Sequence, residues 1–66
     1  MRVQINNEVI ELFEGARVKD AVRKYSRTDL NRIESNTRKI VDRYGNRLAL
    51  DGELSDGDDF YIRDCP

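Results

Sequence analysis

The hydrophobic pattern of this 66-residue chain changes its period once, and that change limits the folds open to it. Near the N-terminus, Val3 and Ile5 alternate with polar neighbours, which is the two-residue period of a half-buried strand. Further along, apolar residues recur at spacings of three and four, the period of one helix face; they are Val18, Ala21, Val22 and Tyr25. A chain that contains both periods is predicted to be α+β, with the helix packed on one face of a sheet.

The first strand is predicted to form a hairpin with a second apolar run, Val9–Phe13. The two runs are joined through the pair Asn6-Asn7, and asparagine tolerates the left-handed backbone conformations that tight hairpin turns require. The pair Glu14-Gly15 then ends the second strand, and the glycine allows a sharp change of direction with a positive φ angle.

One main helix is predicted over about residues 17–25, because its apolar stripe is continuous and charged residues fill the other face. It spans only two to three turns, so packing against a sheet must supply most of its stability. After it, Thr28 is predicted to cap a short helical turn over Asp29–Glu34. Leu30 and Ile33 are three residues apart and would face inward from that turn.

The second half of the chain is predicted to contain three short strands. Turn sequences such as Tyr44-Gly45-Asn46 separate the apolar runs. The three runs are Arg38–Arg43, Arg47–Leu50 and Phe60–Arg63. Together with the hairpin they predict a single domain over residues 1–66, with a mixed sheet of four to five strands. Because a helix crosses over between the hairpin and the later strands, the first and last strands are expected side by side in the middle.

The composition excludes most catalytic chemistry. The chain has no histidine and a single cysteine, Cys65, so Ser-His-Asp and Cys-His arrangements, an internal disulfide and the usual Cys/His zinc site are all excluded. The acidic residues near the C-terminus lack the spacing of an EF-hand and are interpreted as turn formers; they are Asp51, Glu53, Asp56, Asp58 and Asp59. We therefore expect a protein that is not an enzyme, with no catalytic residues, no cofactor and no metal.

The N-terminal sequence lacks the apolar run of a signal peptide, and no stretch of the chain is apolar enough for a membrane span. A lone cysteine is typical of a reducing compartment. We therefore expect a cytoplasmic protein whose partners do not include a membrane.

Charge is distributed unevenly along the chain, although its net value is only −1. Residues 17–47 carry a balance of +6, whereas residues 1–16 carry −2 and residues 48–66 carry −5. Either the basic middle meets the acidic ends within the fold, or it forms a binding face for an acidic partner. The candidate partner-binding residues are Arg23, Arg27, Arg38, Lys39, Arg43 and Arg47.

Two segments, Gly15–Val22 and Leu54–Ile62, resemble motifs of the ubiquitin-like β-grasp superfamily. Gly15–Val22 is similar to the Gly-x-x-Val-x-x-hydrophobic entry into the helix of those proteins. Leu54–Ile62 is similar to their Leu-x-Asp-Gly-Asp-x-hydrophobic-x-hydrophobic turn into the last strand, in which Gly57 would be left-handed. The nearest subfamilies are the ThiS/MoaD sulfur carriers and the TGS domains. The resemblance implies a β-grasp fold, and it covers almost the whole chain.

The resemblance leaves three functions open. ThiS and MoaD carry sulfur on a C-terminal Gly-Gly, whereas this sequence ends Ile62-Arg63-Asp64-Cys65-Pro66, without those glycines. The leading prediction is a non-catalytic protein-interaction or regulatory module. One alternative is a degenerate ThiS/MoaD-type sulfur carrier in cofactor biosynthesis, in which Cys65 would carry the sulfur. The other is a TGS-like domain that docks on RNA, for which the arginine-rich middle suits phosphate contacts.

Overall fold

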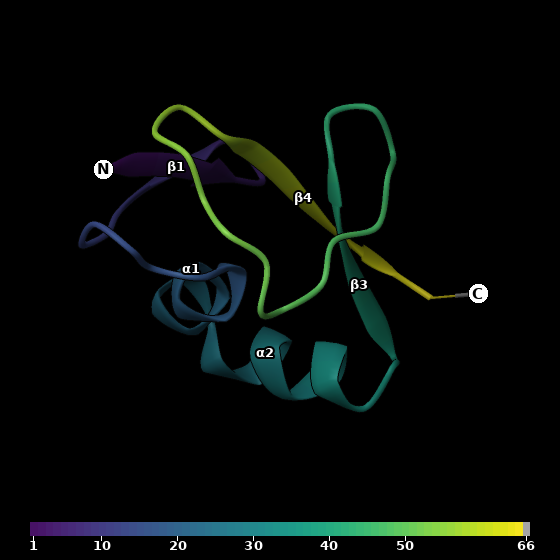
Figure 1. Cartoon of the computed structure of the whole chain (residues 1–66). Coiled ribbons are helices and arrows are strands. Elements are labelled where there is room, and N and C mark those ends of the chain that lie inside the picture. The colour runs from purple at the N-terminus through teal and green to yellow at the C-terminus, as the bar shows by residue number, and fades with distance from the viewer. Residues whose placement is uncertain (66) are drawn as a thin grey trace.

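The computed structural model describes residues 1–65 and shows a four-stranded mixed sheet with two helices on one face (Figure 1). The elements are β1 (Arg2–Ile5), β2 (Glu8–Glu11), α1 (Val18–Tyr25), α2 (Arg27–Glu34), β3 (Arg38–Asp42) and β4 (Asp59–Asp64). The predicted α+β class is therefore confirmed. The predicted domain spans residues 1–66, and the C-terminal sequence contrasted with the Gly-Gly of ThiS and MoaD ends at Pro66. Pro66 lies outside the described residues.

The N-terminal hairpin forms where the sequence predicts it. β1 and β2 pair antiparallel, from Arg2 opposite Glu11 to Ile5 opposite Glu8. The connecting residues Asn6 and Asn7 have φ angles of 50° and 68°, so both adopt the left-handed conformation that a two-residue hairpin turn needs.

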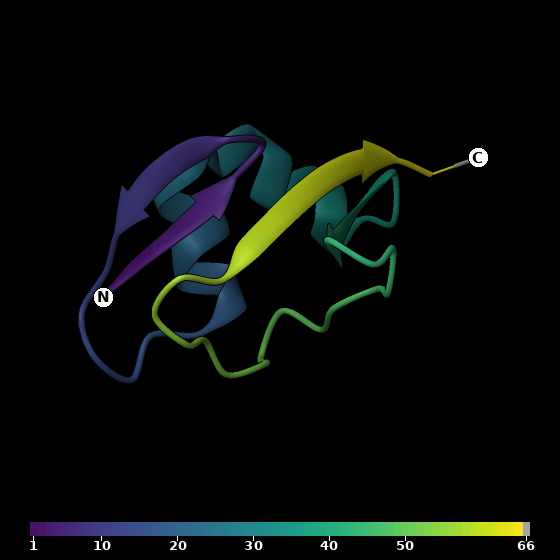
Figure 2. The same cartoon turned by 90° about the horizontal axis from the view of Figure 1, so that it is seen from above.

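The sheet has the strand order β2-β1-β4-β3, which places the first and last strands in the middle. β1 and β4 run parallel, with Ile5 opposite Phe60, and Figure 2 shows them side by side over the helices. β3 pairs antiparallel with β4 along its whole length. The expected central pairing is confirmed, and it follows because α1 and α2 carry the chain across the sheet before β3 and β4 form.

The helical region differs from the prediction of one main helix and a short turn, because it contains two helices of eight residues each. Ser26 separates them and serves both: its backbone N–H donates to Val22 O at 2.7 Å, and its Oγ accepts from Asp29 N–H at 3.2 Å. Ser26 is therefore the N-cap of α2, the role that the sequence analysis gave to Thr28. Its extended backbone lets the chain turn without a longer linker.

The predicted strand Arg47–Leu50 is wrong, since the segment forms only an isolated bridge between Arg47 and Val41. Its backbone partners lie on two different elements. Leu48 N–H donates to Ile40 O on β3, whereas Leu50 O accepts from Lys19 N–H at the start of α1. A segment divided in this way between a strand edge and a helix end cannot form a continuous ladder.

One hydrophobic core lies between the sheet and the helices. Val3, Ile5 and Ile40 come from the sheet, and Val18 and Val22 come from α1; all five side chains are almost fully buried. Tyr25 packs against this core while half-buried, as its place in the helical stripe predicts, and Leu54 does the same. None of the helices within residues 1–65 has the length and apolar character needed to cross a membrane.

Candidate functional site: a basic furrow beside helix α2

The six predicted partner-binding residues do not form one surface. Arg38 lies inside a network of ion pairs, Lys39 lies on the open face of the sheet, and Arg43 lies at the tip of the loop after β3. Arg23, Arg27 and Arg47 line two adjoining hollows on the helical side of the molecule. The basic stretch of sequence is thus divided among different faces.

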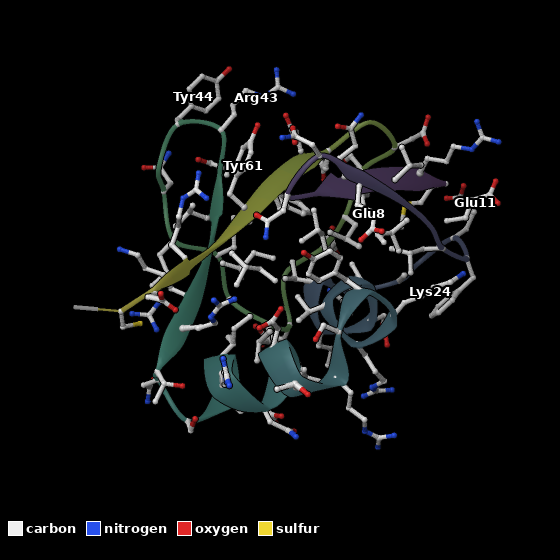
Figure 3. All side chains as sticks on the ribbon, turned by 180° about the vertical axis from the view of Figure 1, so that it is seen from behind. Glu8, Glu11, Lys24, Arg43, Tyr44 and Tyr61 are labelled. Atoms are coloured by element: carbon white, nitrogen blue, oxygen red, sulfur yellow. The ribbon has the colours of Figure 1, made fainter. Side chains whose placement is uncertain are left out.

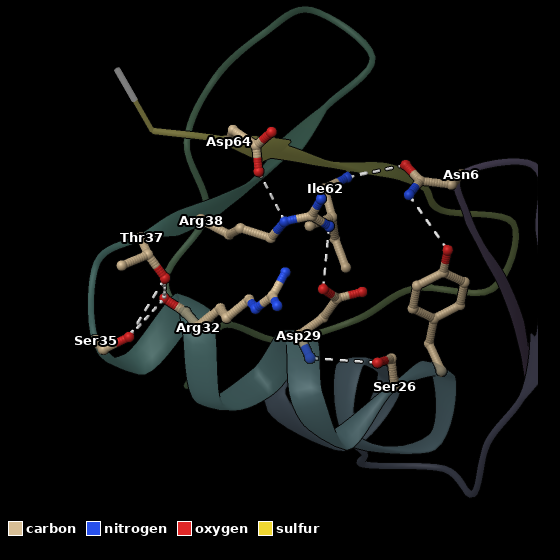
Figure 4. Close-up of polar contacts among 10 residues, drawn as sticks. Asn6, Ser26, Asp29, Arg32, Ser35, Thr37, Arg38, Ile62 and Asp64 are labelled. Carbon is tan, nitrogen blue, oxygen red and sulfur yellow. Dashed lines mark hydrogen bonds and ion pairs between the residues drawn. The ribbon is translucent and has the colours of Figure 1, made fainter.

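Arg38 connects three elements through its guanidinium group (Figure 4). Its Nη1 donates to Asp29 Oδ1 on α2 at 3.0 Å, and its Nε donates to Asp64 Oδ1 on β4 at 2.9 Å. The Arg38 side chain is 26% exposed and that of Asp29 is 15% exposed, so this pair is largely shielded from water. Arg38 is therefore engaged within the fold, and the pairing with Asp64 joins the basic middle to the acidic C-terminal segment.

Lys39 and Arg43 face away from the helices. Lys39 lies opposite Arg63 on the sheet surface, where the Arg63 guanidinium carbon lies 5.1 Å from the centre of the Tyr61 ring. Arg43 and the exposed Tyr44 form the tip of the loop in Figure 3. Neither cation adjoins the hollows that Arg23, Arg27 and Arg47 line.

The loop that carries Arg43 is organised by Asp42. Its Oδ1 accepts from the backbone N–H groups of Tyr44 and Asn46 at 2.9 and 3.0 Å. Partial burial raises the pKa of Asp42, but these backbone hydrogen bonds, the Asn46 side chain and the charge of Arg43 together hold that pKa below its usual value. The carboxylate form of Asp42 is therefore the form that the folded loop stabilises.

We expect the stabilisation from Asp42 to be fully present above its unfolded pKa, about 3.9, and to be lost as the pH falls through the lower folded pKa. The measurement is the carboxyl carbon chemical shift of Asp42 in an NMR titration. An Asn46→Ala substitution should raise the pKa of Asp42, because it removes the side-chain hydrogen bond. An unchanged titration in that variant would contradict the assigned cause.

The two hollows lie between α2 and the segment 47–51 and adjoin at Glu34 and Leu50, which line both. Their volumes are about 440 and 430 Å³. We call the combined depression the basic furrow. Its lining residues are Lys19, Arg23, Arg27, Leu30, Asn31, Ile33, Glu34, Asn36, Arg47, Leu48, Ala49, Leu50 and Asp51.

The furrow carries four cations and two carboxylates, which gives it a balance of +2. Within residues 1–65, no carboxylate oxygen lies within 4.0 Å of the charged nitrogens of these cations, which are Lys19, Arg23, Arg27 and Arg47. Arg47 Nη2 makes a long hydrogen bond, 3.4 Å, to Asn36 Oδ1. The guanidinium and ammonium groups thus retain most of their capacity to bind an external carboxylate.

The local structure explains which cations reach the furrow. Lys19 and Arg23 are four residues apart on α1 and therefore lie on one face of that helix. Lys24, the neighbour of Arg23, contacts β2, where its Nζ donates to Glu11 O at the end of the strand (Figure 3). Arg27 begins α2 and continues the row that Lys19 and Arg23 form.

Sequence reasoning missed Lys19 and the apolar floor of the furrow. The four-residue spacing of Lys19 and Arg23 within the predicted helix indicated that these two cations share a face, whereas Arg27 lies beyond that helix. No local signal placed Leu48 and Leu50 beside α2, because that contact depends on how the segment 47–51 crosses the helices. These two leucines are half-buried, and together with the exposed Ala49 they give the furrow an apolar centre.

Two of the five acidic residues predicted as turn formers accept hydrogen bonds from backbone N–H groups. Asp56 Oδ1 accepts from Arg2 N–H and Asp58 Oδ2 accepts from Ser55 N–H, each at 2.7 Å. Between them Gly57 has a φ angle of +87°, the left-handed conformation expected for this turn. Across residues 1–65, no group of three potential metal-ligating side chains comes together.

Comparison of the chain with protein-family models, curated proteins and solved structures gave no match. The resemblance to β-grasp proteins therefore stays a prediction that rests on the sequence motifs.

Proposed function

We propose that this chain is a non-catalytic β-grasp module that binds an acidic segment of a protein partner in the basic furrow. The β-grasp assignment is supported by the N-terminal hairpin, the helical crossover and the parallel pairing of β1 with β4 at the centre of the sheet. It is also supported by the left-handed Gly57 in the turn before the last strand.

The observation that carries the proposed function is the row of unpaired cations along the furrow. Lys19, Arg23 and Arg27 line one hollow and Arg47 lines the next. Cations that are left unpaired at a concave site attract carboxylates, and arginine in addition binds them through two parallel hydrogen bonds. The chain has thirteen acidic residues, yet among the residues described no carboxylate oxygen lies within 4.0 Å of the charged nitrogens of this row.

The composition of the furrow favours a protein partner over RNA. Leu48 and Leu50 provide an apolar floor, and Glu34 and Asp51 would repel a continuous phosphate backbone. Base stacking needs aromatic side chains, and none of the furrow's described lining residues is aromatic. A protein segment can instead alternate carboxylates with apolar side chains.

The test is a fluorescence anisotropy titration of a library of acidic octapeptides, with a single-stranded RNA of mixed sequence as a second probe. We expect the wild-type protein to bind the peptides and to release them as salt rises. Replacing two rim cations in an Arg23→Gln/Arg27→Gln variant should weaken binding about tenfold, since each exposed charge pair contributes about 0.2–1 kcal/mol.

The matched control is a Lys39→Gln/Arg43→Gln variant, which changes the net charge equally but lies outside the furrow. It should bind the peptides like the wild type. Equal losses in both variants, or preferential binding of the RNA, would contradict the proposed function.

A further inference from the structure

The cations of the basic furrow are divided between its two hollows. Lys19, Arg23 and Arg27 lie in the hollow at one end, and Arg47 lies in the hollow at the other. The two hollows meet at Leu50, with Leu30 on one side and Leu48 on the other. The furrow thus has cations at its two ends and leucines in its centre, where Glu34 also lines both hollows.

The length of the furrow sets a spacing for the partner. Asn36, which accepts a hydrogen bond from Arg47, lies two residues beyond the end of α2. Nine residues from Arg27, at the helical rise of 1.5 Å per residue, place it about 13 Å from the start of the helix. An extended peptide covers that distance in about four residues, because each residue adds about 3.3 Å. In an extended chain the side chains at positions i, i+2 and i+4 point to the same side.

We infer that the partner segment is an extended peptide with the pattern acidic-x-apolar-x-acidic, an inference that rests on the proposed function. The two outer carboxylates bind the cations at the ends of the furrow, at Arg27 and at Arg47. The central apolar side chain packs on the floor between Leu48 and Leu50. Glu34, which lines both hollows, adds selectivity, because it repels a peptide with an acidic residue at its centre.

The inference is tested with three labelled peptides of equal length and charge, two of which have the same composition. The patterned peptide contains Glu-Ser-Leu-Ser-Glu, the scrambled one contains Glu-Glu-Ser-Ser-Leu, and the third replaces the leucine of the pattern with serine. We expect the patterned peptide to bind at least about tenfold more tightly than either of the others, because both lose the apolar contact at the centre. Equal binding of all three overturns the pattern.

Charge reversal at each end of the furrow provides an independent readout. In an Arg27→Glu variant and in an Arg47→Glu variant, one outer carboxylate of the peptide is repelled, and replacing it with lysine should restore affinity. The two variants should prefer opposite peptides, one Lys-Ser-Leu-Ser-Glu and the other Glu-Ser-Leu-Ser-Lys. A glutamate in the first turn of α2 also suits the helix dipole, so Arg27→Glu should leave the fold intact.

The outcomes separate the two proposals. If acidic peptides bind through Arg23 and Arg27 regardless of spacing or leucine, the pattern is wrong and the proposed function stands. If both reversal variants prefer the same peptide, the inferred placement of the carboxylates is wrong. If no acidic peptide binds the wild-type protein, both proposals fail.

Discussion

Replacing Asn6 with alanine is expected to lower the free energy of unfolding by about 3 kcal/mol, which is a large share of the total for a domain of this size. Asn6 Oδ1 accepts from Ile62 N–H at 3.0 Å and so extends the pairing of β4 beyond the end of β1 (Figure 4). Its Nδ2 donates to Tyr25 Oη at 3.3 Å. Alanine loses both hydrogen bonds and must also adopt a φ angle of 50°.

Asn7 provides the matched control for Asn6. It has the same left-handed backbone, with a φ angle of 68°, but its side chain is exposed. Asn7→Ala should therefore cost only the backbone strain, about 1 kcal/mol. Asn6→Asp should be nearly neutral, because a carboxylate accepts from Ile62 N–H and Tyr25 can donate its hydroxyl proton. Urea unfolding followed by circular dichroism measures all three, and equal effects of Asn6→Ala and Asn7→Ala would contradict the role of the Asn6 amide.

The second large effect is expected at the ion pair between Arg38 and Asp29. A double-mutant cycle with Arg38→Gln and Asp29→Asn should give a coupling energy of about 1–2 kcal/mol, between the values typical of exposed and of fully buried pairs. The pair is only partly exposed, and it fastens α2 to β3. Arg38→Glu should lower the free energy of unfolding more than Arg38→Gln does, because it places a third carboxylate beside Asp29 and Asp64.

Asp64 supplies an internal comparison, because it binds the same guanidinium group from an exposed position. Its side chain is 78% exposed, against 15% for Asp29. The Arg38–Asp64 coupling should therefore be below about 0.5 kcal/mol and should vanish in 1 M salt, whereas the coupling to Asp29 should largely persist. Equal couplings, or equal salt sensitivity, would show that burial does not distinguish the two pairs.

Local sequence was sufficient wherever one short segment fixes its own conformation. The Asn6-Asn7 turn, the helix at Val18–Tyr25 and the turn at Gly57 were predictable because backbone conformation and apolar period are properties of neighbouring residues. The second helix was predicted only in part. Both Ser26 and Thr28 are good helix caps, and which of them is used depends on where Leu30 and Ile33 meet the core.

The segment 47–50 shows where local patterns fail. Leu48 and Leu50 alternate like strand residues, but the backbone of the segment bonds to β3 at one end and to α1 at the other. The same crossing creates the basic furrow, since it brings the segment against α2. A pattern within four residues cannot specify partners that lie on two distant elements.

The sequence by itself determined the α+β class, the hairpin, the central pairing of the first and last strands and the basic balance of the middle of the chain. Only the tertiary structure decided which of those cations form ion pairs with carboxylates and which line a common surface. Arg38 pairs with two carboxylates, whereas Arg27 and Arg47 lie at opposite ends of one furrow although they are twenty positions apart in the sequence. The physical reason is that conformational preference is local, whereas pairing and exposure depend on distances between segments remote in the chain.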